Sequence, residues 1–184
     1  MIEVGENQIN RINTLLSGIP KGVEKVLTNA INRGLVNARS NSTKLIAQTY
    51  HIKQKDLKGK SNIKIKNASF SDLEGNILFA GTVIPLIKFK VNPTKQQQKV
   101  VTVAVLKASG GQRLKSAYVA NLGKYDTGVF ERLTKKRETS QELYGPSTAH
   151  MAKNEDVTNK VSEEAQIMVN KRVEHEISRI LNKY

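Results

Sequence analysis

The chain has 184 residues, with 30 lysines and arginines against 16 aspartates and glutamates, so its formal net charge is +14 at pH 7. This length suits about one domain with a substantial buried core, and it excludes two catalytic domains of ordinary size. The absence of cysteine excludes disulfides, thiol catalysis and thiolate metal sites.

Hydropathy and the first residues give no sign of a membrane or secretory segment. No stretch approaches the ~18 consecutive apolar residues of a transmembrane helix. The first six residues are acidic, whereas a secretory signal begins with basic residues followed by apolar ones. We therefore expect no membrane partner, and a protein that stays in the cytoplasm unless it leaves as part of a particle.

The positive charge is concentrated in the middle of the chain. Residues 51–150 contain 18 basic and 7 acidic side chains, a net charge of +11, whereas residues 1–50 contain 6 and 3 and residues 151–184 contain 6 and 6. Because these side chains are dispersed along predicted strands, they indicate a folded surface and not a basic tail. That surface is either a solvated sheet face or a binding surface for an acidic protein or DNA.

The first 50 residues have the spacing of helices. Apolar residues three or four apart predict a short helix that ends at residues 17–20, where a glycine and a proline occur. The same spacing predicts a second, amphipathic helix of about 28 residues from Lys21 onward. Gly34 weakens the middle of this helix by about 1 kcal/mol relative to alanine, so a kink or a close contact is expected there.

After Tyr50 the apolar period changes from that of a helix to that of a strand. Alternating or continuous apolar residues predict strands in segments 63–66, 76–86, 87–91, 100–106, 117–120 and 128–130. The third and fourth of these form a hairpin, and a second hairpin has a basic tip at residues 132–137. Alternation places Ile87, Phe89 and Val91 on one face and Lys88 and Lys90 on the other.

A last helix of about 26 residues is predicted from Asp156, its expected N-cap. At 1.5 Å per residue it spans about 39 Å, so we expect it to project or to pack against another subunit. The grouping of strands predicts a single α+β domain, with a helical part at 1–50, an antiparallel sheet of about five to seven strands at 60–147 and the helix at 155–184.

The sequence offers little for catalysis. The three histidines lack metal-ligand spacing, and the adjacent Glu174, His175 and Glu176 splay around a helix, where we interpret them as solvated surface. The carboxylates are scattered among lysines and arginines, and no nucleophile or nucleotide-binding motif is present. We therefore predict no enzymatic activity, no metal and no cofactor; a nuclease would need metal-dependent turnover.

Several segments together resemble the minor tail protein Z family of tailed phages and prophages. They are residues 50–58 after the long helix, 81–86 leading into 89–93, 128–132 with Arg137, and 142–147 before Met151. The resemblance extends over about residues 25 to 180 and depends on the order and spacing of these pieces. Glu138 and Thr139 depart from the pattern, which has a proline and an apolar residue there.

The resemblance implies a structural virion protein of the phage tail, assembled in the host cytoplasm. It would complete the head-proximal end of the tail and so enable head-tail joining. Proteins at that junction typically form rings, often hexameric, around the DNA channel. The implied partners are further copies of the chain, other tail or neck proteins and, non-specifically, channel DNA.

We predict a basic contact surface for assembly or DNA, and a turn of fixed geometry at Gly145 and Pro146. The contact residues are Lys53, Lys55, Lys88, Lys90, Arg132, Lys135, Lys136 and Arg137. The alternative function is that of a sequence-independent nucleic-acid-binding protein, which would act through its basic sheet surface.

Overall fold

The structure is a computed structural model that describes residues 5–58, 62–96, 100–121, 127–134 and 139–183. The chain divides into two compact units. We call the first the helical unit; it comprises Met1–Ser42, Ile63–Leu78 and Glu155–Tyr184. The second, the β unit, comprises Thr43–Asn62 and Phe79–Asn154.

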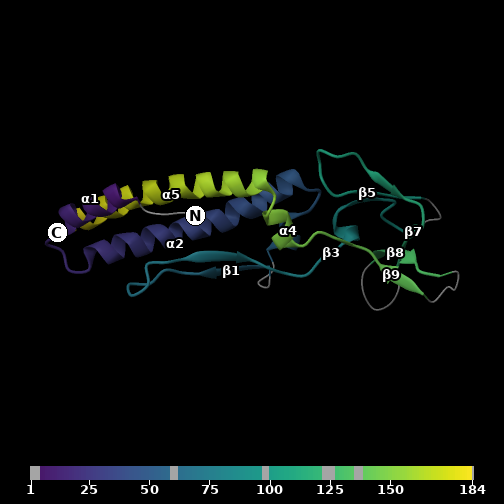
Figure 1. The fold of residues 1–184 in the computed structure, drawn as a ribbon, viewed down its shortest axis with the longest axis horizontal. Coiled ribbons are helices and arrows are strands. Elements are labelled where there is room, and N and C mark those ends of the chain that lie inside the picture. Colours follow the sequence, from purple (N-terminus) through teal and green to yellow (C-terminus); the bar gives the residue numbers. More distant parts are fainter. Residues whose placement is uncertain (1–4, 59–61, 97–99, 122–126, 135–138, 184) are drawn as a thin grey trace. The chain divides into compact units, whose positions relative to one another are not determined.

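Three helices dominate the helical unit, as their apolar spacing predicts: α1 (Glu6–Leu16), α2 (Gly22–Thr49) and α5 (Glu155–Leu181). Figure 1 shows them side by side. Their apolar stripes form one core, which consists of Ile12, Leu16, Val26, Leu27, Ala30, Val169, Val173, Ile177 and Ile180. Each such large side chain stabilises the fold by about 1.5–3 kcal/mol when fully buried.

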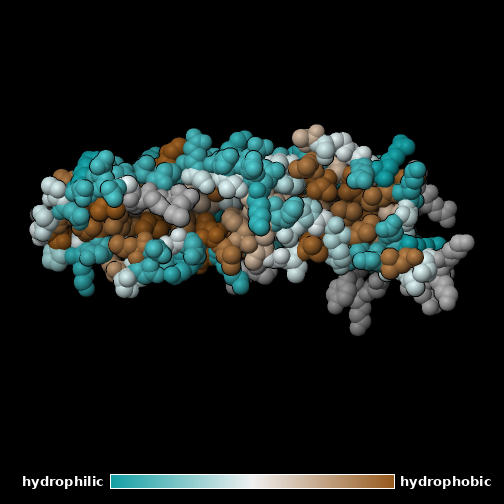
Figure 2. Space-filling view, in the orientation of Figure 1, coloured by the Kyte–Doolittle hydropathy of each residue, from teal (hydrophilic) through white to brown (hydrophobic). Residues whose placement is uncertain are grey.

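Polar contacts fix the directions of the helices. Asn29 of α2 contacts Glu176 of α5, and Asn41, three turns later, contacts Glu164, so α2 and α5 are antiparallel. Polar side chains cover the outer faces of the helices, and apolar atoms are visible between them (Figure 2). The last helix was expected to project or to pack against another subunit; its apolar face is in fact covered within its own chain, and packing against another subunit stays a prediction.

Gly34 allows α2 and α5 to approach closely, which confirms the expected close contact. A Cβ atom at this position would overlap Cγ2 of Val169. The last helix begins at Glu155, so Asp156 lies in its first turn and is not the expected N-cap.

A two-stranded sheet of β1 (Ile63–Lys66) and β2 (Asn76–Phe79) belongs mainly to the helical unit. The loop between the strands is anchored to α2. The Asn32 amide donates to the Ala68 carbonyl oxygen at 3.0 Å and accepts from the Ala68 backbone nitrogen at 2.8 Å. The Asn32 side chain thereby satisfies the backbone donor and acceptor of Ala68, which the loop does not pair with another strand.

The described part of the β unit contains three further antiparallel sheets. Strand β3 (Ile84–Pro85) pairs with β10 (Tyr144–Gly145). Strand β5 (Val101–Ala104) lies between β4 (Lys90–Asn92) and β6 (Gln112–Leu114). Strand β8 (Gly128–Arg132) lies between β7 (Ala117–Ala120) and β9 (Ser140–Glu142). The short helices are α3 (Gln54–Leu57), η1 (Leu86–Lys88) and α4 (Thr148–Ala152).

The α+β class is confirmed, and both predicted hairpins pair as β4–β5 and β8–β9. The strands nevertheless form several small sheets and not one. The apolar run at 76–86 is interrupted at Gly81, whose φ of 103° suits glycine, and continues only as the short β3.

The predicted alternation at residues 87–91 is correct only in part. Phe89 and Val91 are buried, and Lys88 and Lys90 are exposed. Ile87 lies in η1 and not in a strand, because the chain makes a 3₁₀ turn before β4 begins. Both basic side chains therefore face solvent as predicted, but only Lys90 lies in a strand.

Candidate interaction surface

Almost all of the net charge belongs to the β unit. By sequence this unit contains 18 basic and 5 acidic side chains, a net charge of +13, whereas the helical unit contains 12 and 11, a net charge of +1. The two units thus differ in charge far more than in size. A surface with this excess attracts anionic partners over about a Debye length, ~8 Å at physiological salt.

The ion pairs of the described residues all lie in the helical unit. Examples are Arg11 with Glu174 at 2.7 Å and Lys66 with Asp72 at 2.8 Å. Across the described part of the β unit, no lysine or arginine lies within 4.0 Å of a carboxylate oxygen. Its positive charge is therefore not neutralised by its own described carboxylates.

Two of these carboxylates bind hydroxyl groups instead. Glu131 accepts a hydrogen bond from Ser116, and Glu142 accepts one from the Tyr144 hydroxyl at 2.7 Å. The bond from Tyr144 to Glu142 raises the pKa of the tyrosine. The described lysines of this unit are exposed to solvent.

Three basic groups gather where α2 ends. Tyr50 pairs with Leu106, and the His51 backbone nitrogen donates to the Val105 carbonyl oxygen at 2.8 Å. The Lys107 ammonium donates to the Ala47 carbonyl oxygen at 2.8 Å, which satisfies one of the last carbonyls of α2. Burial lowers the pKa of His51, and the charges of Lys90 and Lys107 lower it further. We call His51, Lys90 and Lys107 the His51 cluster.

The structure places the predicted contact residues at several points of the β unit. Lys53 and Lys55 are exposed at the start of α3, and Lys88 is exposed in η1. Lys90 belongs to the His51 cluster. The Arg132 guanidinium lies 5.6 Å from the centre of the Tyr118 ring, a cation–π contact. The remaining three, Lys135, Lys136 and Arg137, lie outside the described residues.

The predicted turn at Gly145 and Pro146 needs a correction. Gly145 lies in β10 and pairs with Ile84, so it is a strand residue. A Cβ atom there would lie 2.5 Å from the Cε2 atom of Phe89. Gly145 therefore allows close packing against the buried Phe89 ring. After it, the Ser147 hydroxyl caps α4 by accepting a hydrogen bond from the His150 backbone nitrogen at 3.2 Å.

A buried charged network in α5 was missed by the sequence analysis. Glu176, interpreted as solvated surface, is completely buried. Its Oε2 atom lies 2.5 Å from Arg179 Nη2 and accepts from the Asn29 amide at 3.1 Å. Arg172 Nη2 lies 2.8 Å from Oε1, yet Oε1 has no aligned hydrogen bond, so this second pair is electrostatic. The signal was available, since residue 176 falls on the apolar stripe between Val173 and Ile180.

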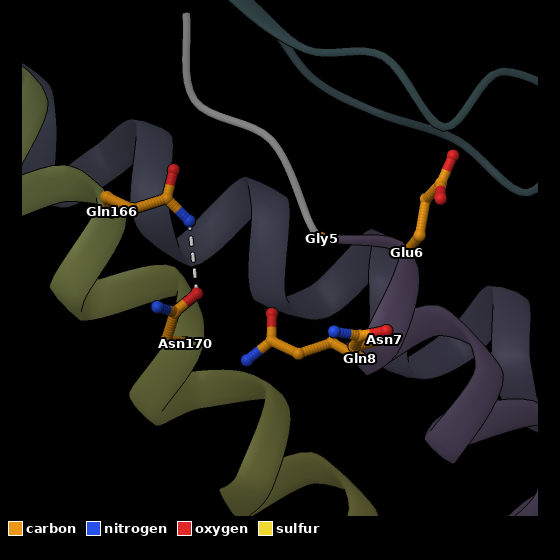
Figure 3. A pocket seen from close by; sticks show the side chains of 6 residues that line it. All are labelled: Gly5, Glu6, Asn7, Gln8, Gln166 and Asn170. Carbon is orange, nitrogen blue, oxygen red and sulfur yellow. Dashed lines mark hydrogen bonds between the residues drawn. The ribbon is translucent and has the colours of Figure 1, made fainter.

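An open polar depression lies beside α1 and α5 (Figure 3). It is lined by Gly5, Glu6, Asn7, Gln8, Gln166 and Asn170. The Gln166 amide donates to Asn170 Oδ1 at 3.0 Å, and Glu6 points away from this pair in Figure 3. Uncharged amides that partly satisfy one another make a solvated surface and not a catalytic centre.

Neither a metal-binding cluster nor a membrane-spanning helix occurs among the described residues. No three histidine, aspartate or glutamate side chains there are placed to hold one metal ion. None of the helices in the same residues is long and apolar enough to cross a membrane.

The model of the prophage minor tail protein Z family matches residues 6–184. The chain belongs to this family. It is therefore a structural protein of the phage tail, located in the tail of the virion, and its partners include other tail proteins. No curated protein and no solved structure is significantly similar to it.

Proposed function

We propose that this minor tail protein completes the head-proximal end of the phage tail and thereby allows the tail to join the head. The observation that supports the proposal is the family match over residues 6–184, nearly the whole chain. The tail acquires its contacts to the head through this protein, which acts by binding and not by catalysis. Assembly takes place in the host cytoplasm before the virion is released.

The proposed working form is a ring of copies, for which a hexamer is the expected size. A ring requires two different and complementary surfaces on each chain. The unequal charges of the helical and β units, +1 and +13, support the presence of two such surfaces. The predicted basic residues of the β unit, Lys135, Lys136 and Arg137 included, serve as assembly contacts in this proposal.

The proposal is tested with tails assembled in the absence of this protein. Purified protein is added to such tails, and their attachment to filled heads is counted by negative-stain microscopy. We expect attachment only after addition, with extra density at the head-proximal end. Attachment that is equally frequent without the protein would disprove the proposed role.

A further inference from the structure

We propose that the His51 cluster is a binding site for a phosphate group, which contacts the ammonium groups of Lys90 and Lys107 and the His51 imidazole. A phosphate in a nucleic-acid backbone and a free phosphate ion offer the same kind of oxygen atoms, and the experiment below distinguishes these two sources. The inference goes beyond the proposed joining of tail and head, and neither depends on the other.

Backbone pairings bring the three residues together where α2 ends. The His51 backbone nitrogen donates to the Val105 carbonyl oxygen at 2.8 Å, and the Lys107 backbone nitrogen donates to the last residue of α2 at 2.9 Å. Lys90 pairs with Ala104, which directly precedes Val105. Three segments that are distant in the sequence therefore meet within the β unit: the residues after α2, β4 and the residues after β5.

The charged groups are close as well as the backbones. Burial is the largest cause of the lowered pKa of His51, and the charges of Lys90 and Lys107 lower it further. Both lysines are exposed and His51 is half-buried, so the cluster is accessible from solvent. One Lys107 hydrogen is bonded to the Ala47 carbonyl oxygen, which holds the ammonium in place and leaves two donors for a ligand. A donor already held in position loses little further side-chain entropy on binding.

Positive charge at the cluster exceeds what the described chain neutralises. The C-terminal end of a helix carries about −0.5 charge, so Lys90 and Lys107 leave an excess of about +1.5 beside the end of α2 while His51 is neutral. Among the described residues, no carboxylate oxygen lies within 4.0 Å of either ammonium. A bound anion would therefore supply the negative charge that the described residues around the cluster do not.

The chemistry of the donors favours phosphate over a carboxylate. Planar, bidentate recognition of a carboxylate is the strength of arginine, whereas lysine binds phosphate as a point charge. The cluster has two lysines and no arginine. A phosphate group is tetrahedral, so its oxygens accept hydrogen bonds from donors that approach from several directions, as donors from three separate segments do.

Two further lysines bear on the source of the phosphate. Lys53 and Lys55 are exposed and follow His51 by two and four residues. A nucleic-acid backbone continues beyond one phosphate and gives these lysines further contacts, whereas a free ion is bound by the cluster alone. Contacts of this kind position a backbone without reading its sequence.

NMR of the imidazole protons tests the site directly in the full chain. Inorganic phosphate and a short DNA duplex are added in separate titrations, with sodium chloride at equal ionic strength as the reference. We expect at least one of them to raise the His51 midpoint by about half a pH unit or more, because a nearby anion favours the imidazolium. The exposed His150 and His175 are controls in the same spectra and should keep their midpoints.

The variant Lys90→Gln with Lys107→Gln should abolish this upward shift, measured from the variant's own midpoint. Circular dichroism verifies its fold, and Lys90→Gln alone, which keeps the bond from Lys107 to Ala47, should weaken the shift. The matched control is Arg113→Gln with Lys115→Gln. It removes two exposed charges in and after β6, which lies on the opposite side of β5 from β4, and should leave the shift unchanged.

Fluorescence anisotropy with the duplex identifies the source. For a backbone phosphate, the double variant at the cluster should lower the slope of log affinity against log salt by about 1, since one phosphate is no longer neutralised. The Arg113→Gln, Lys115→Gln control should keep the wild-type slope. A His51 shift with inorganic phosphate, together with an unchanged duplex slope in the cluster variant, would identify the free ion as the ligand.

Three results would overturn the inference. The first is a His51 midpoint that moves with neither phosphate nor duplex. The second is an equal shift in the cluster variant, or at His150 and His175, which would show general screening and not a site. The third is an equal His51 shift with poly-glutamate at the same concentration of charge, which would show that the cluster accepts carboxylates as readily as phosphates.

Discussion

Glu176 is the residue at which burial and charge conflict most strongly. A carboxylate removed from water is costly unless it is paired and hydrogen-bonded. Here two arginines of the same helix and one asparagine of α2 surround it. Arg179 and Arg172 lie three and four residues from Glu176, and their side chains are 41% and 32% exposed, so they solvate the carboxylate from outside the core.

The variant Glu176→Gln should lower the free energy of unfolding by about 1–3 kcal/mol, because the arginines and Asn29 lose a charged acceptor. Urea denaturation followed by circular dichroism measures this change. The matched control is Glu174→Gln, which removes an exposed ion pair with Arg11 and should cost less than about 1 kcal/mol. Equal costs at the two positions would contradict a special role for the buried carboxylate.

His51 should titrate below its ordinary pKa of 6.5, because burial and then Lys90 and Lys107 disfavour its charged form. The unfolded chain consequently binds a proton at higher pH than the folded chain does. This histidine therefore destabilises the fold as pH falls through 6.5 toward the lowered pKa, and it is without effect above that window. The midpoint is measured by NMR of the imidazole protons.

Substitution identifies the source of the His51 shift. Lys90→Gln should move the NMR midpoint upward, whereas Lys95→Gln, a change at an exposed lysine that is not among the causes of the shift, should leave it in place. An unchanged midpoint in Lys90→Gln would show that the charge of Lys90 does not lower the pKa of His51.

At the scale of elements, Gly34 tests how α2 and α5 pack. Gly34→Ala gains up to about 1 kcal/mol of helix propensity, but overpacking against Val169 costs about 1–3 kcal/mol, so we expect net destabilisation. The loss of unfolding free energy in the double variant with Val169→Ala should be smaller than the sum of the losses in the two single variants, by about 0.5 kcal/mol or more. Denaturation of all four proteins in the cycle gives this coupling energy.

Gly18→Ala is the control for the Gly34 cycle, because a Cβ atom at Gly18 meets no atom within 4 Å. It should leave stability almost unchanged. Strict additivity between Gly34→Ala and Val169→Ala would contradict the close helix contact.

The elements that the sequence predicts well are those with long periodic patterns. The apolar stripes of α1, α2 and α5 extend over several turns, so their existence and approximate ends follow from spacing. The strands were harder, because β3 and β10 have two residues each and exist only through their mutual pairing. The division into small sheets depends on tertiary contacts, such as Gly145 against Phe89, that local pattern does not encode.

The candidate surface was predictable in the same uneven way. The exposure of Lys88 and Lys90 follows from alternation with the buried Phe89 and Val91. The approach of Lys90 to His51 does not follow, because it depends on contacts between the end of α2 and the segment after β5, such as the bridge between Tyr50 and Leu106. The alternation of apolar and charged residues thus identifies which side chains are exposed. Which exposed side chains lie close together depends instead on pairing between segments that are distant in the sequence.

At the scale of the whole molecule, α2 connects the two units, since Gly22–Ser42 belongs to the helical unit and Thr43–Thr49 to the β unit. Helix formation is cooperative along the chain. When one unit unfolds fully, the part of α2 that belongs to the other unit therefore frays as well. We therefore propose that the chain unfolds as the single domain predicted from its sequence, in one two-state transition.

Two probes distinguish one transition from two. Ellipticity at 222 nm reports mainly the long helices, and tyrosine fluorescence reports mainly the β unit, which contains four of the five tyrosines. Thermal curves from the two probes should coincide, and Gly34→Ala, a change within the helical unit, should lower both midpoints equally. A shift in the helical signal alone would mean that the β unit folds independently, and its basic surface would then form without the helices.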